Sequence, residues 1–259
     1  MLKIENFEVT GWEAAIRGMR NPKNSWERSD SFIPCYQKTK CHECADNQKC
    51  AYYFEYDGLP YKKDDFIGTN DLDLMTRLRN AGTDHRKFMR MITVYFDITA
   101  PLYFWKEFDT YKVGTVANSC STMHKIAAKE FTLEDFSHEH LKSFDWDLSM
   151  NNSVDLCIDE SGLHDGSVLY SPFGILNLTI KSLNTCRKKY LETKDKKYWW
   201  QMIQLLPSSY NQKRTVMLNY EVLANMYKSR RNHKLDEWHT FCDWIESLPY
   251  SELITGKGD

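Results

Sequence analysis

Four of the eight cysteines crowd into one short segment, in a pattern that could hold a metal ion. They are spaced Cys-x5-Cys-x2-Cys-x5-Cys, at Cys35, Cys41, Cys44 and Cys50. A Cys-x-x-Cys pair places two thiolates on one ion, and the two flanking cysteines can complete a tetrahedral shell. The spacing predicts a zinc site, with an iron-sulfur cluster as the second choice and unligated thiols as the remaining alternative.

A second set of residues could bind an anion or the edge of a pyrimidine. Asn219 and Arg230 are eleven residues apart, which is close to three helical turns. On an unbroken helix both side chains would lie on nearly one face, where an arginine fork and an amide can bind a phosphate or a base. The alternative is that Arg230 ends a helix beside Arg231 and pairs with a surface carboxylate.

Small hydrogen-bonding residues gather after Gly114. They include Asn118, Ser119 and Ser121. We expect a loop here that turns tightly and aims amides and hydroxyls at an anion. The alternative is an ordinary Ser/Thr cap for a helix that begins near Met123.

Two basic stretches could add positive charge to such a site. Tyr111 offers a stacking surface and Lys112 a point charge. His85, Arg86 and Arg90 precede a predicted strand. The alternative for these cations is a solvated surface without a ligand.

The elements that must position these residues are both helices and strands. Residues 11–20 form a short helical pattern, and a second helix is predicted from Asn70 to a stop near Gly82. Residues 92–99 alternate apolar and polar side chains, which predicts a strand, and a helix follows Pro101.

Helices are predicted to dominate the C-terminal third of the chain. One is marked by apolar residues from Val216 to Tyr227, and the last by those from Leu235 to Leu248. Together the elements predict an α/β (α+β) fold in which helices pack on strands. We expect one domain over residues 1–259, with a cysteine-rich insertion at 31–66.

Composition excludes several function classes. The chain has 259 residues, of which 42% are hydrophobic, and a net charge of -2. It can bury a large core, and its charge argues against a protein whose main task is to coat nucleic acid. No stretch approaches the roughly 20 apolar residues of a membrane helix, and the N-terminus lacks a secretory signal. We therefore expect a cytoplasmic protein that no membrane helix anchors.

Two separated segments resemble the flavin-dependent thymidylate synthases. In that family a strand and a helix lead into the signature R-H-R-x-x-S-x-x-x-x-S-x-R, and here the same order leads into residues 109–121. When residues 109–121 are aligned with the signature without gaps, Ser119 falls on its second serine. The leading basic residues and the final arginine are replaced, by Asp109, Thr110, Tyr111 and Ser121.

The second segment is C-terminal. The family has Leu-Pro, a helix with N-x-R, then L-R and a nearby histidine. Here the corresponding residues are Leu206-Pro207, Asn219-Tyr220-Glu221, Ser229-Arg230 and His233. Arg230 thus resembles the family arginine that contacts the nucleotide, whereas Glu221 replaces a basic residue.

The resemblance implies a ThyX-like fold, a mixed sheet with packed helices. It also implies an enzyme that transfers a one-carbon unit to a pyrimidine deoxynucleotide, dUMP or a related substrate. It implies FAD, NADPH and methylene-tetrahydrofolate as cofactors, and a homotetramer with active sites between subunits. Ser119 and Arg230 would be the catalytic residues. The substrate contacts would be Arg230, Asn219, Ser119, Lys112, Tyr111 and Ser121, and the cofactor contacts His85, Arg86, Arg90 and Asn118.

Two other functions stay open at this point. The first is a non-catalytic nucleotide-binding or regulatory protein on the same fold, which Asp109 in place of an arginine favours. The second is a zinc-stapled module that binds nucleic acid through the cysteine segment, which the near-neutral charge disfavours.

Overall fold

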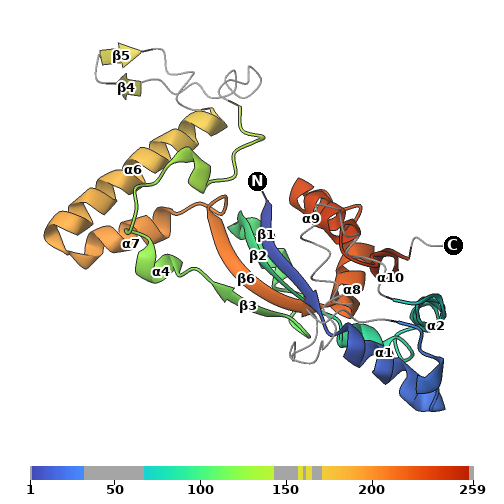
Figure 1. The fold of residues 1–259 in the computed structure, drawn as a ribbon. Helices are drawn as coiled ribbons and strands as arrows, with labels where there is room; N and C mark the ends of the chain where they lie inside the picture. Colours follow the sequence, from blue (N-terminus) through green and yellow to red (C-terminus); the bar gives the residue numbers. More distant parts are fainter. Residues whose placement is uncertain (1, 32–66, 143–156, 160–161, 165–170, 257–259) are drawn as a thin grey trace, which may run out of the picture. The chain divides into compact units, whose positions relative to one another are not determined.

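The computed structural model describes residues 2–31, 67–142, 157–159, 162–164 and 171–256 (Figure 1). The chain divides into two compact units. The first comprises residues 1–3, 99–108 and 119–214, and the second 4–98, 109–118 and 215–259. The four-cysteine segment, predicted as an insertion at 31–66, falls outside the described residues apart from its edges.

Four strands form an antiparallel sheet. Its strands are β1 (Lys3–Thr10), β2 (Thr93–Pro101), β6 (Asn211–Asn219) and β3 (Val116–Ser119), in the order β1-β2-β6-β3. Side-chain pairs fix the direction of β1 and β2, because Thr10 bonds Thr93 at 2.8 Å while Asn6 bonds Asp97 at 3.0 Å. The α/β fold and the strand predicted at 92–99 are confirmed.

Helices of the second unit flank its strands. They are α1 (Trp12–Arg20), α2 (Thr69–Asn80), α8 (Tyr220–Arg230), α9 (Asp236–Glu246) and α10 (Glu252–Thr255), with 3-10 turns at Asn21–Lys23, Trp26–Arg28 and Lys87–Arg90. Aromatic side chains fill its core: Trp12 meets Tyr220 edge-on at 5.3 Å, and Phe96 packs on Trp244 at 4.6 Å. The predicted helices at 11–20, 70–82 and 235–248 are confirmed.

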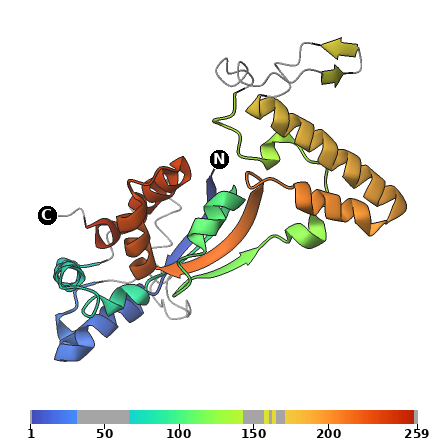
Figure 2. The same cartoon turned by 180° about the vertical axis from the view of Figure 1, so that it is seen from behind.

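The first unit is built on a helical hairpin. Its elements are α3 (Leu102–Phe108), α4 (Thr122–Lys125), a 3-10 turn (Leu133–Asp135), β4 (Cys157–Asp159), β5 (Gly162–His164), α6 (Pro172–Thr193) and α7 (Lys196–Leu205). The last two helices pack against each other (Figure 2). The core of this unit contains Ile126, Phe131, Phe136, Leu176, Leu183 and Met202.

Two local predictions are wrong. Val216 belongs to β6 and not to a helix, because Val216 and Leu218 are both buried while their neighbours are less so, which is the period of a strand. Residues 116–119 form β3 and not a tight loop. Its four residues are all exposed, so they show none of the apolar alternation that would mark a strand in the sequence.

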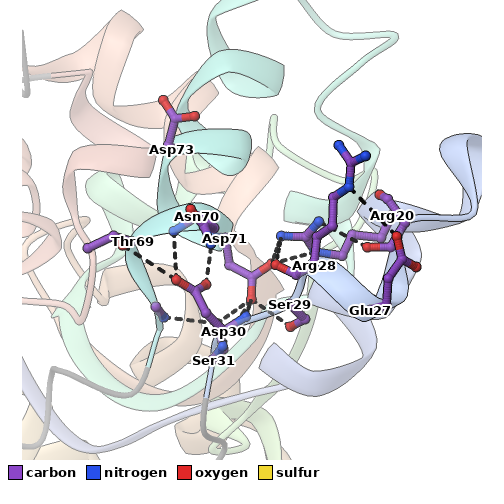
Figure 3. Close-up of polar contacts among 12 residues, drawn as sticks. Arg20, Glu27, Arg28, Ser29, Asp30, Ser31, Thr69, Asn70, Asp71 and Asp73 are labelled. Atoms are coloured by element: carbon purple, nitrogen blue, oxygen red, sulfur yellow. Dashed lines mark hydrogen bonds and ion pairs between the residues drawn. The ribbon is translucent and has the colours of Figure 1, made fainter.

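A buried polar cluster joins the loop before residue 32 to α2 (Figure 3). Arg20 is 4% exposed and its Nε donates to Asp71 Oδ1 at 2.6 Å, while the fully buried Asp71 also accepts from Ser29 and Ser31 at 2.7 and 2.6 Å. Asp30 accepts from the backbone of Asp71 at 3.1 Å and so helps to cap α2.

The hydrogen bonds of this cluster control the ionisation of its carboxylate. Burial alone would raise the pKa of Asp71, but the bonds from Ser29, Ser31 and Arg20 outweigh burial and lower the pKa below 3.8. Asp71 is therefore ionised in the folded protein at neutral pH.

No helix in the described ranges is both long and apolar enough to cross a bilayer.

Candidate functional site

Helix α8 connects most of the predicted ligand contacts in the second unit. Asn219 is its N-cap: the side-chain oxygen accepts from the backbone of Val222 at 3.0 Å. Arg230 is its last residue, so one unbroken helix joins the two, but Asn219 itself has extended backbone and ends β6. Asn219 has a local structural role in addition to any contact with a ligand.

Arg230 is held among aromatic side chains. Its Nε donates to Tyr111 Oη at 3.0 Å, and its guanidinium carbon lies 5.6 Å from the centre of the Tyr111 ring. On the other helix, α9, Trp238 lies 4.9 Å from the same guanidinium. Tyr111 and Trp238 meet edge-on at 6.2 Å. The guanidinium thus has a defined place, which suits paired N–H donation to a phosphate or carboxylate.

The turn at Gly114 contacts the other end of α8. A Cβ atom built at Gly114 would lie 3.0 Å from Asn219 Nδ2 and 3.2 Å from a methyl group of Val222. Because Tyr111 contacts Arg230, residues 111–114 run alongside the helix from its last residue to its cap. Lys112 is exposed on this segment. The positive charge of Lys112 favours an anion here.

Arg86 has an acidic partner on α8. Its Nε lies 2.8 Å from Glu221 Oε2, with side chains 16% and 8% exposed, although the alignment forms no hydrogen bond. Its Nη2 donates to Asn225 at 3.3 Å. The charge of Arg86 is therefore largely compensated within the protein, whereas His85 and Arg90 are exposed.

The predicted serine contacts belong to the end of β3 and the start of α4. Asn118 and Ser119 are exposed strand residues. Ser121 caps α4 by accepting from the backbone of His124 at 3.1 Å, which is the local role considered above as the alternative for this cluster. Ser119 lies in the first unit and Arg230 in the second, so their convergence on one ligand stays a prediction.

The predicted metal ligands Cys35, Cys41, Cys44 and Cys50 fall outside the described residues. Among the residues that are described, no group of three or more His, Cys, Asp or Glu side chains is placed to hold a metal ion. The zinc site stays a prediction from spacing alone.

Two residues of this region do not stand out in the sequence. Trp238 has the 3.6-residue spacing of a core position and is indeed fully buried, yet it also packs on Arg230. Asn225 lies four residues after Glu221 on α8, the spacing at which both can reach one partner. That spacing could have identified Asn225 once the helix was recognised.

Comparisons with known proteins come from structure alone. No protein-family model matches the chain, and no curated protein matches it in sequence. A crystal structure of ThyX, a thymidylate synthase from Helicobacter pylori with FAD and dUMP, superposes with a TM-score of 0.58 at 14% identity, covering 99% of this chain and 98% of that one.

A second solved structure is similar. The UMP/dUMP methylase PolB from Streptomyces cacaoi, bound with 5-Br UMP, gives a TM-score of 0.51 at 11% identity, covering 95% of this chain and 88% of that one. The chain therefore has a ThyX-like fold.

Proposed function

We propose that the protein is a flavin-dependent enzyme of the thymidylate synthase type that transfers a one-carbon unit to dUMP or a related pyrimidine deoxynucleotide. The observation that carries the proposal is the cluster of Arg230, Tyr111 and Trp238 beside Lys112. It combines a positioned guanidinium with a second cation, as recognition of a phosphate requires. The fold supports the proposal, because similar structures contain dUMP or a UMP analogue.

Each residue has a defined task in this proposal. Arg230 and Lys112 bind the phosphate, and Tyr111 holds the guanidinium in place through its hydroxyl. Ser119 and Asn219 contact the base. Ser121, two residues after Ser119 at the N-cap of α4, is a further substrate contact. Ser119 and Arg230 are the two proposed catalytic residues.

The cofactor contacts are proposed on the same basis. His85 and Arg90 are exposed cations or potential cations that could meet the phosphates of FAD, with Arg86 and Asn118 as further contacts. FAD would supply the hydride chemistry, with NADPH as reductant and methylene-tetrahydrofolate as carbon donor. We also propose a cytoplasmic homotetramer.

Tritium release from 5-tritiated dUMP, with FAD, NADPH and methylene-tetrahydrofolate present, tests the enzyme. We expect release by the unmodified chain and a loss of about 100-fold or more for Arg230→Ala, since a charged hydrogen bond and its positioning are removed together. Lys228→Ala, an exposed cation on the same helix, is the matched control and should leave release unchanged. Release that is indifferent to Arg230→Ala would contradict the site.

A non-catalytic nucleotide-binding protein is the second candidate. The ion pair between Arg86 and Glu221 favours it, because a compensated arginine attracts a flavin phosphate less strongly. Absorbance between about 350 and 500 nm after incubation with FAD separates the two. A protein that binds dUMP but takes up no flavin would be the regulatory form.

The cysteine segment is proposed to bind zinc. Elemental analysis of the purified chain should give one zinc per protein, reduced in Cys41→Ser and Cys44→Ser. The control is Cys186→Ser, which changes a half-buried thiol on α6. Iron with visible absorbance would indicate a cluster instead.

A further inference from the structure

The tip of the α6–α7 hairpin concentrates positive charge. Between residues 187 and 197 there are six basic residues and two acidic ones, in a chain whose net charge is -2. The basic residues are Arg187, Lys188, Lys189, Lys194, Lys196 and Lys197. The end of α6 and the start of α7 bring them to one end of the hairpin (Figure 2).

Most of this charge is not compensated. Lys197 pairs with Asp195 at 2.9 Å, and Lys189 is a loose 3.9 Å from Glu192. In the part of the chain that the structure describes, Lys188, Lys194 and Lys196 have no ion-pair partner, and all three are exposed. A surface that holds several unpaired cations together attracts a polyanion.

Exposed aromatic surface lies beside these cations. The Trp200 side chain is 45% exposed although it is large and apolar. The ammonium group of Lys196 lies 5.8 Å from the Trp200 ring and 5.9 Å from that of Trp199. Trp199 is fixed by a hydrogen bond from its indole to the Met123 carbonyl at 3.1 Å, and it meets Trp200 edge-on at 4.8 Å.

We propose that this tip binds single-stranded nucleic acid. Unpaired lysines contact successive phosphates while Trp200 stacks on a base, the combination by which proteins bind single strands without reading their sequence. A duplex would offer the phosphates but keep its bases stacked inside, so it would use only part of the surface. The proposed surface consists of other residues than the proposed mononucleotide site, and the proposal does not depend on that site.

Fluorescence anisotropy of the full chain with labelled oligothymidine and oligouridine of about 20 nucleotides tests the proposal. We expect Trp200→Ala and Lys196→Glu each to weaken binding by about tenfold. Three phosphate contacts predict that log K falls with log salt with a slope of about -2. The two oligomers distinguish DNA from RNA, and a duplex of equal length should bind more weakly than either.

Matched variants elsewhere in the chain control for charge and aromatic loss. Trp26→Ala removes a tryptophan that is 49% exposed, and Lys23→Glu makes the same charge change at an exposed lysine. Neither should alter binding. The proposal is overturned by absence of binding at low salt, by equal loss in the control variants, by duplex binding as tight as single-strand binding, or by capture on anionic lipid vesicles without oligonucleotide binding.

Discussion

At the scale of single residues, Arg230 shows how a charged side chain can be given one position. Its Nε donates to the Tyr111 hydroxyl group at 3.0 Å, and Trp238 packs against the guanidinium. Aromatic rings of this kind reduce the freedom of an arginine without neutralising it. A ligand that binds there therefore meets donors that are already oriented.

Tyr111→Phe isolates that orienting bond. The ring remains, but the hydroxyl partner of Arg230 is lost, and a hydrogen bond to a charged group contributes about 1.5–3 kcal/mol. We expect the dissociation constant for dUMP, measured by calorimetry, to rise about tenfold or more. Tyr198→Phe on α7 is the control and should leave it unchanged. An unchanged affinity in Tyr111→Phe would mean that the hydroxyl does not position the arginine.

The Arg20–Asp71 pair predicts how stability responds to acid. The folded pKa of Asp71 is below its unfolded value, so its contribution is fully present above pH 3.8 and is lost as the pH falls through the lower, folded pKa. Asp71→Asn leaves a buried, unpaired Arg20 and should cost about 3–5 kcal/mol in urea unfolding at pH 7.

The matched control for this pair lies on the same helix. Asp73 pairs with Arg77 at 2.8 Å, but both side chains are more than half exposed. Asp73→Asn should therefore cost at most about 1 kcal/mol. Equal losses in the two variants would contradict the role given to burial.

The contact between Arg230 and Tyr111 shows which features of the site residue types predict and which they do not. Each was predicted separately as a nucleotide contact, because arginine and tyrosine chemistry suits that ligand. Their mutual bond depends on the course of residues 111–114 along α8, a long-range contact that no local pattern encodes. The same holds for Glu221, whose partner Arg86 lies far away in sequence.

At the scale of elements, the sequence predicts best where one periodicity holds throughout. Residues 92–99 alternate cleanly and form β2, and the spacing from Leu235 onward gives α9. Around Asn219 a strand passes directly into a helix, and the apolar spacing that predicts α8 extends back to Val216, which belongs to β6. β3 is an exposed edge strand, where burial imposes no pattern.

The backbone conformation and close surroundings of Gly11 leave no room for a side chain at the start of α1. Its φ is +91°, and a Cβ atom there would lie 2.0 Å from the Met91 carbonyl oxygen. Gly82 has a similar φ of +106° but no atom within 4 Å of a built Cβ. Gly82→Ala should lower the unfolding free energy by about 1–2 kcal/mol through backbone strain alone.

Gly11→Ala should lower the unfolding free energy by a further amount of about 1–3 kcal/mol, because the Met91 carbonyl must move. Urea unfolding of both variants separates the two effects. If Gly11→Ala were no less stable than Gly82→Ala, the close approach of Met91 would not be a real constraint.

At the scale of the whole molecule, the proposed enzyme implies an oligomer. A homotetramer of 30.7 kDa chains should sediment with a mass of about 123 kDa. Cyclic or dihedral assembly would let one subunit complete the site of another. A monomer at micromolar concentration that still turns over dUMP would contradict active sites shared between subunits. Four of the five boundaries between the two compact units fall inside strands (β1, β2, β3 and β6), where composition marks no linker, and the fifth follows α3.

The polar cluster around Asp71 has a consequence for how such a chain can diversify. The backbone of Gly68 donates to Ser31 Oγ at 3.0 Å, so these two residues, 37 positions apart in sequence, are in direct contact. When the two ends of a segment are held together, each doubling of its length costs only about 0.6 kcal/mol of loop-closure free energy. Insertions and replacements between Ser31 and Gly68 can therefore be tolerated while the start of α2 keeps its contacts.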